Sequence, residues 1–356
     1  MPREDLTLKE KATLYGMTRF PGYNDRELSE VLNEKMSTVT SIRRRLKERG
    51  VCFKAMVPSF RALGCEVISL CYGGISSGLL IDMKKAMERG LFVGNDDSAF
   101  FAQVGTFSWL ELGAFPNFSS AKGQGEVMWK KLNDILGGVS GQPCLQSYYP
   151  LDQMRIHNFF DYTGLLSELF HLDRRPQRRP ASEGHPTRKL SHIEKLVFYG
   201  LVKHPDVADK VVAEHMKVSR QAVARIRKLL IKEGFLFPLV IPNLEKLGHE
   251  ILVYFRFHLN PRLGEKARAG AVQTIVNGVP NLFSFSTSLE CVAIGAFCTF
   301  PEFEKSSHRM IRRLEERKLL EGAPDLQTYL LPDTVIVRNH DYVPLVKNLL
   351  ELDIEG

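Results

Sequence analysis

The sequence predicts an α+β protein built from two similar halves, each with a helical module followed by an antiparallel α/β module. The first observation is an internal repeat, because residues 6–64 match residues 190–248 at a constant offset of 184 without a gap. The second is a change of pattern at the same place in both halves, from helical periodicity to strand-like apolar runs. A repeat of this length indicates that one structural module occurs twice in the chain.

The repeated segment reads as three helices followed by a strand pair. In the second copy an apolar stripe from Ile193 to Leu201 forms the first helix, Asp206 can cap the second, and Ser219 caps the third. Gly234 ends the third helix, as Gly50 does in the first copy. The tails CFKAMVP and LFPLVIP read as strands. This order is that of a winged helix-turn-helix, which presents its third helix to the DNA major groove.

The third helix of the second copy has a basic face opposite its apolar one. Val223, Ile226 and Leu230 recur at helical spacing and should be buried, so Gln221, Arg225, Lys228 and Lys232 are exposed. A face of this kind contacts DNA or is simply solvated. Residues 35–54 carry a charge of +6, and residues 174–189 and 217–234 carry +5 each, against +7 for the whole chain. This concentration of positive charge favours nucleic acid as a partner.

The segment after each helical module predicts a βαββαβ domain. In the first half the elements are CEVISLCYGGI, LLIDMKKAMERG, SAFFAQVGTFS, WLELGAF, EVMWKKLNDIL and LQSYYPLDQMRIHNFF. The same order returns after residue 249, and LQSYYPLD is echoed by LQTYLLPD. This is the ferredoxin-like arrangement. The expected domains are residues 1–64, 65–172, 190–248 and 249–356, with an Arg- and Pro-containing linker at 173–189.

With these two modules in this order, the chain resembles the Lrp/AsnC (leucine-responsive, or feast/famine) family of transcription regulators. The residues that carry the resemblance are Gly50, Pro58, Leu63 and Gly64, and again Gly234, Pro242, Leu247 and Gly248. The resemblance implies a sequence-specific regulator that binds double-stranded DNA and, in its α/β domains, an amino-acid effector. The chain departs from the family by its tandem fusion and by the turns GTFSWLE and STSLEC, which replace a turn rich in glycine and acids.

The predicted DNA-binding residues lie on and beside the two third helices. They are Ser37, Thr38, Ser41, Arg43, Arg44, Arg45, Ser219, Arg220, Gln221, Arg225, Arg227, Lys228 and Lys232. Gln pairs well with adenine and Arg with guanine, whereas Ser and Thr discriminate poorly between bases. We therefore expect the second module to read sequence and the first to anchor on phosphates; contact with phosphates alone is the alternative.

Signatures of catalysis are weak, so the sequence-based expectation is a protein that is not an enzyme. There is no P-loop or GxGxxG, GQGE at 123–126 lacks the remaining P-loop residues, and no catalytic residue, metal ligand or cofactor is expected. The alternative is an enzyme on the same architecture, because siroheme decarboxylases resemble Lrp/AsnC proteins. In that reading His157, with Arg338 as its counterpart in the repeat, and Arg155 would serve the carboxylates of the tetrapyrrole.

The remaining expectations concern location and assembly. The charged N-terminus and the absence of a long apolar run predict a cytoplasmic protein without a membrane span. The six cysteines, without CxxC spacing, read as reduced core thiols. Because each antiparallel sheet should bury one face, we expect residues 65–172 to pack on residues 249–353 as an intrachain pseudo-dimer. A homodimer is left open.

Overall fold

A computed structural model of the chain describes residues 5–74, 97–105, 108–136, 144–172 and 188–353. The chain divides into two compact units, each assembled from three separate segments. Unit 1 contains residues 1–54, 154–183 and 238–332, and unit 2 contains residues 55–153, 184–237 and 333–356. The predicted helix at 79–90 and nearly all of the linker lie outside the described residues. Among the described helices, none has the length and apolarity needed to cross a membrane.

The first two helices of unit 1 each begin with a capping box. Thr7 caps the first helix together with Glu10, and Asn24 caps the second together with Glu27. The third helix turns Val39, Ile42 and Leu46 inward, as its periodicity predicts. The helices are α1 (Leu8–Arg19), α2 (Asp25–Leu32), α3 (Met36–Glu48) and, after the first α/β segment, α6 (Thr163–Leu169). Leu166 of α6 is fully buried in the core that α1–α3 form.

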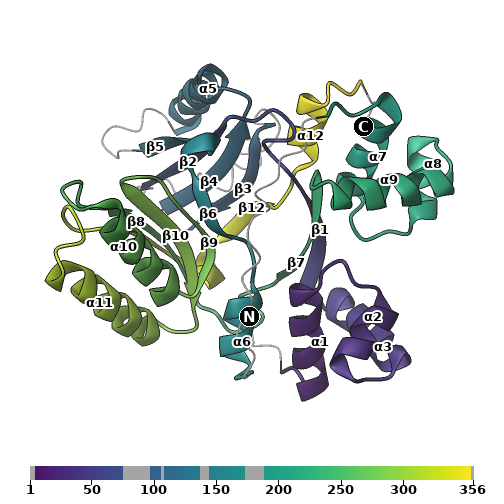
Figure 1. Cartoon of the computed structure of the whole chain (residues 1–356), viewed down its shortest axis with the longest axis horizontal. Helices are drawn as coiled ribbons and strands as arrows, with labels where there is room; N and C mark the ends of the chain where they lie inside the picture. The colour runs from purple at the N-terminus through teal and green to yellow at the C-terminus, as the bar shows by residue number, and fades with distance from the viewer. Residues whose placement is uncertain (1–4, 75–96, 106–107, 137–143, 173–187, 354–356) are drawn as a thin grey trace. The chain divides into compact units, whose positions relative to one another are not determined.

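The sheet of unit 1 is antiparallel in every described pair and has the order β11-β8-β10-β9-β6. Its strands are β6 (Arg155–Phe159), β8 (Ile251–His258), β9 (Asn281–Ser286), β10 (Glu290–Phe297) and β11 (Asp325–Leu330). Alternate residues of β8, from Ile251 to Phe257, and Leu259 just after the strand enter one apolar core. Two helices, α10 (Glu265–Gly278) and α11 (Phe300–Glu316), lie over that face and complete the core (Figure 1).

Unit 2 repeats this plan with the sheet order β12-β3-β4-β2-β5. Its strands are β2 (Val67–Gly74), β3 (Ala99–Val104), β4 (Ser108–Phe115), β5 (Cys144–Pro150) and β12 (Val335–Asn339). Its helices are α5 (Phe118–Leu136), α7 (His192–Lys203), α8 (Asp209–Met216), α9 (Arg220–Lys232) and α12 (Val343–Leu349). A further pair of strands, β1 (Cys52–Pro58) and β7 (Leu236–Pro242), forms a two-stranded sheet, and the boundary between the units falls within both strands.

The last strand of each half differs from the sequence-based expectation. Residues 155–159 pair with β9, whose sequence lies in the second half, and residues 335–339 pair with β3 of the first half. The sequence pattern showed a strand but not its partner, because one strand satisfies its hydrogen bonds on any antiparallel edge of matching register. The contiguous domain limits and the pairing of the two α/β domains stay predictions.

Three local expectations can be compared with the structure. Ser219 does cap α9, accepting a hydrogen bond from the Ala222 amide at 3.1 Å, so that prediction is confirmed. Asp206 does not cap α8, because that helix starts later, with Ala208 in the N-cap position and no side-chain cap. Gly50 and Gly234 have positive φ values of 62° and 78°, as the C-terminal turn of each third helix requires.

Candidate active site

The outer strand β6 of unit 1 holds an imidazole at an irregularity of the sheet. Arg155 lies opposite Ser286 and Phe159 opposite Phe283, with a register shift between Ile156 and Asn158. His157 is therefore the extra residue of a bulge, a feature that re-aims a side chain and is frequent beside active sites. Its Nε2 lies 2.8 Å from Ser286 Oγ, and the imidazole is half-buried.

Hydrogen bonds around Asn158 fix the strand next to this histidine. Its side-chain amide donates to the backbone carbonyl of Asn281 at 2.8 Å, and its Oδ1 accepts from the Asp161 amide at 2.8 Å. The Asp161 carboxylate in turn accepts from the Thr163 amide at 2.9 Å, where α6 begins. The backbone on the C-terminal side of the bulge is thus fixed, which helps to place the His157 ring.

Arg155 brings a positive charge to the same strand. It is exposed, and no ion pair to it occurs in the part of the chain that the structure describes. An exposed guanidinium without an ion pair can bind a carboxylate through two parallel hydrogen bonds. Arg155 and His157 therefore combine an anion-binding group with a group that can donate a proton.

The equivalent strand of unit 2 corrects the matching made from the sequence. Arg338 lies opposite Ala102, and the register shift of β12 falls between Ile336 and Arg338, so that Val337 is the bulge residue. Val337 is therefore the counterpart of His157, and Arg338 that of Asn158. The backbone agrees, since Phe160 and His340 have positive φ values of 50° and 57°. The pairing of His157 with Arg338 was wrong because it assumed a deletion that the two strands do not have.

Arg338 and His340 are built into the interior of unit 2. Arg338 is buried, and its Nη1 donates to the Ala99 carbonyl at 2.7 Å. His340 packs against Phe101 with ring centroids 5.7 Å apart, and its Nδ1 lies 3.2 Å from the Tyr342 hydroxyl. Burial lowers the pKa of His340 to about 3, so the imidazole is neutral at physiological pH. These two residues stabilise unit 2, and they are not suited to binding a substrate carboxylate.

A second polar cluster in unit 1 is already neutralised. Arg256 donates to both oxygens of Glu290, at 2.8 and 3.3 Å, and His258 lies 3.5 Å from the same carboxylate. The other ring nitrogen of His258 lies 3.6 Å from Asp325. Because Glu290 accepts both of these hydrogen bonds from Arg256, the network ties β8, β10 and β11 together and does not offer that guanidinium to a second carboxylate.

Thiol and metal chemistry receive little support from the described residues. Burial raises the pKa of Cys65 and of Cys291 to about 12, so neither thiol is a ready nucleophile. No group of three or more His, Cys, Asp or Glu side chains in the described ranges is arranged to hold a metal ion.

The predicted DNA-binding residues fall into two sets. The exposed ones are Ser37, Ser41, Arg44, Arg45, Ser219, Arg220, Gln221, Arg225, Lys228 and Lys232, while Thr38, Arg43 and Arg227 are half-buried. Arg43 pairs with Asp25 at 2.5 Å, and Arg227 pairs with Asp209 at 2.7 Å, in each case joining the third helix to the second. Contact of the exposed residues with DNA stays a prediction.

No protein-family model matches the sequence, and no curated protein matches it. Among solved structures, the siroheme decarboxylase NirDL is similar over 96% of this chain and 98% of its own, with 10% identity and a TM-score of 0.53. NirDL in complex with an iron-uroporphyrin III analogue is similar over 96% and 99%, with 12% identity and a TM-score of 0.52. A transcriptional regulator of Neisseria meningitidis in complex with L-methionine covers 40% of this chain, with 14% identity and a TM-score of 0.34.

These comparisons overturn two sequence-based expectations. The chain shares its fold, over nearly its full length, with siroheme decarboxylase. The interpretation as a DNA-binding regulator without catalytic activity was therefore wrong, and the alternative reading is favoured. The physical origin of the error is visible in α3 and α9, where part of the positive charge serves ion pairs inside the helical modules.

Sequence reasoning also missed Ser286, the hydrogen-bond partner of His157. Ser286 lies 129 residues away and belongs to the other half of the repeat. Its contact depends on the pairing of β6 with β9, for which the sequence gives no signal.

Proposed function

We propose that this protein is a siroheme-decarboxylase-like enzyme, which removes carboxylate groups from the side chains of an iron tetrapyrrole. The observation that carries the proposal is the fold shared over the whole chain with NirDL, one of whose structures holds an iron-uroporphyrin III analogue. In finer detail we propose two winged helix-turn-helix modules and two ferredoxin-like sheets, with the sheets carrying the chemistry.

The reaction demands few protein groups. The bond between a side-chain methylene and its carboxylate breaks, CO2 leaves, and the electron pair that stays on the methylene carbon takes up one proton. The enzyme must hold the other carboxylates of the substrate and supply that proton. Iron belongs to the substrate here.

Arg155 and His157 fit these two roles. Arg155 is exposed and, within the described structure, without an ion pair, so a substrate carboxylate can occupy its guanidinium. His157 lies two residues further along β6, with Ser286 at 2.8 Å orienting its ring. An imidazole held in position by a hydrogen bond is a common general acid in enzymes.

The direct test is to incubate the purified chain with siroheme and to follow the tetrapyrrole by mass spectrometry and the gas phase by CO2 detection. We expect a change in the visible spectrum on binding, then a product that has lost CO2 from one or more side chains. The proposal is wrong if siroheme neither binds nor loses CO2 under conditions in which NirDL converts it.

A further inference from the structure

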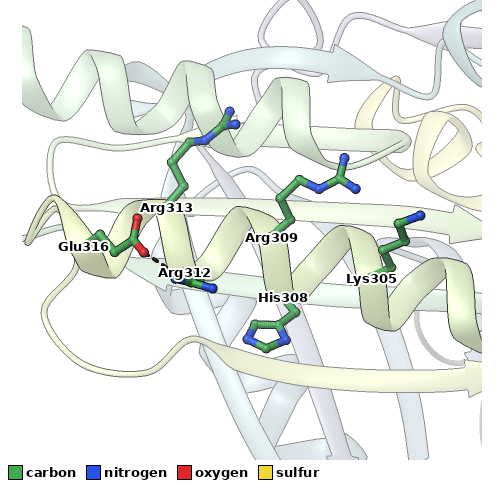
Figure 2. A pocket seen from close by; sticks show the side chains of 6 residues that line it. All are labelled: Lys305, His308, Arg309, Arg312, Arg313 and Glu316. Atoms are coloured by element: carbon green, nitrogen blue, oxygen red, sulfur yellow. Dashed lines mark hydrogen bonds and ion pairs between the residues drawn. The ribbon is translucent and has the colours of Figure 1, made fainter.

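The outer face of α11 in unit 1 carries an unusual row of positive charge. The helix buries Phe303, Ser307, Met310 and Leu314. Its opposite face is exposed and lines a surface hollow of about 500 Å³, formed by Lys305, His308, Arg309, Arg312, Arg313 and Glu316 (Figure 2). Lys305, Arg309 and Arg313 recur every fourth residue, which places them about 6 Å apart along the axis. Their side chains extend from the same side of the helix (Figure 2).

This row is not neutralised within the described structure. Arg312 pairs with Glu316 at 2.8 Å. Lys305, Arg309 and Arg313 have no ion-pair partner among the described residues. A single carboxylate therefore faces four cations along the hollow.

Helix stability does not account for the row. Like charges four residues apart repel one another and weaken a helix. Cations near the C-terminus are favoured by the helix dipole, which explains Arg313 in the last turn. The dipole effect is confined to that turn, so it does not explain Lys305 or Arg309.

The lining indicates the chemistry of the ligand. Its one ring is the imidazole of His308, and it contains no aliphatic side chain, so it has no broad apolar surface that would cover a tetrapyrrole ring. Three of its four cations are arginines, which bind carboxylates through paired hydrogen bonds. A helix with Glu or Asp at every fourth residue presents carboxylates at the same spacing of about 6 Å.

We infer that this face of α11 is a docking surface for an acidic helical segment of a partner protein. The segment would lie along α11 and place its carboxylates against Lys305, Arg309 and Arg313. Since the contact is exposed and electrostatic, it would be weak, fast and sensitive to salt. It does not depend on the proposed decarboxylation.

The test uses an alanine-rich helical peptide with glutamate at every fourth position, and a matched peptide with glutamine there. Fluorescence anisotropy with the full-length protein at low ionic strength should show binding of the glutamate peptide only. The triple variant Lys305→Gln, Arg309→Gln and Arg313→Gln should weaken it by about tenfold or more, because three contacts of modest strength combine.

The matched control removes three other exposed cations from unit 1, by Arg26→Gln, Arg262→Gln and Lys266→Gln, and should leave binding unchanged. Circular dichroism confirms that both variants fold. The inference is overturned if the two peptides bind equally, or if both triple variants weaken binding alike. It is also overturned if single-stranded or duplex DNA binds more tightly than the glutamate peptide and only the α11 variant abolishes that binding.

Discussion

His157 and His340 show how position alone separates a chemical role from a structural one. His157 sits in the bulge of an outer strand, half-buried and 2.8 Å from Ser286. His340 follows the equivalent strand β12 but is enclosed by aromatic rings, which hold it neutral. In the sequence both are single histidines outside any catalytic motif, and the difference in their burial is not apparent there.

The role of His157 can be tested within the proposed reaction. His157→Ala should lower kcat for siroheme decarboxylation by about 10²–10⁴-fold, the usual contribution of a positioned acid. Siroheme should still bind, because Arg155 is intact. Arg155→Gln should instead raise KM, since it removes contact with a carboxylate. His192→Ala, an exposed residue at the start of α7, is the control and should change neither constant; equal losses in all three variants would contradict the assignment.

His340 predicts an acid-sensitive unit 2. Its pKa is about 3 in the folded chain against an ordinary 6.5, so below 6.5 the unfolded chain binds the extra proton. Its contribution to stability is complete above about pH 6.5 and is lost as the pH falls toward 3. His340→Phe, the residue found at the equivalent position 160, should remove this dependence. Urea unfolding at several pH values between about 3 and 6.5 measures this dependence. The unfolding free energy of the variant should change less steeply with pH than that of the unaltered protein, by up to about 1.4 kcal/mol per pH unit.

At the scale of elements, the ends of helices could be predicted from the sequence where they depend on residues that are neighbours in the chain. The cap at Ser219 and the glycine turns at Gly50 and Gly234 follow from single residue types. The start of α5 could not be predicted from the sequence, because Phe118–Gly125 contains serines and glycines that are typical of a loop. Asn117 nevertheless accepts from the Ser120 amide, and Gly125 leaves room for Gln146 of β5, which a Cβ would meet too closely.

The N-terminus of α7 makes a testable contribution of its own. Ser191 and Glu194 form a capping box, and Arg188 lies 2.9 Å from the Glu194 carboxylate. Hydrogen bonding to Arg188 is the largest cause that lowers the pKa of Glu194, to about 2. Ser191→Ala should cost about 1 kcal/mol of unfolding free energy.

Glu194→Gln should remove a contribution that is present above about pH 4.5 and lost as the pH falls toward 2. The matched change Thr7→Ala, at the equivalent cap of α1, should give a loss of similar size. Denaturant midpoints at neutral pH measure both losses, and an unchanged midpoint for Ser191→Ala would show that this cap is not formed in solution.

At the scale of the molecule, the repeat in the sequence predicted two equivalent halves but not how the units are composed. Unit 1 takes β6 and α6 from the first half for a sheet whose other strands lie in the second, and unit 2 takes β12 and α12 in return. The register of β6 on β9 and of β12 on β3 involves residues that are far apart in sequence, and no local pattern records it. The candidate site could not be fully predicted from the sequence for the same reason, because Ser286 contacts His157 only when β6 pairs with β9.

The composition of the units predicts that neither half folds as an independent monomer. Residues 1–187 made alone lack β8–β11 for unit 1 and β12 for unit 2, and residues 188–356 made alone lack β6 and the strands β2–β5. Each half would expose an unpaired strand edge and would carry one strand, β6 or β12, without its partner. Produced separately, the halves should aggregate or lack a cooperative thermal transition. Produced together, they should copurify as a one-to-one complex that melts cooperatively near the temperature of the intact chain. A single half that is monomeric by light scattering and melts cooperatively would show that each sheet is completed from its own half of the sequence.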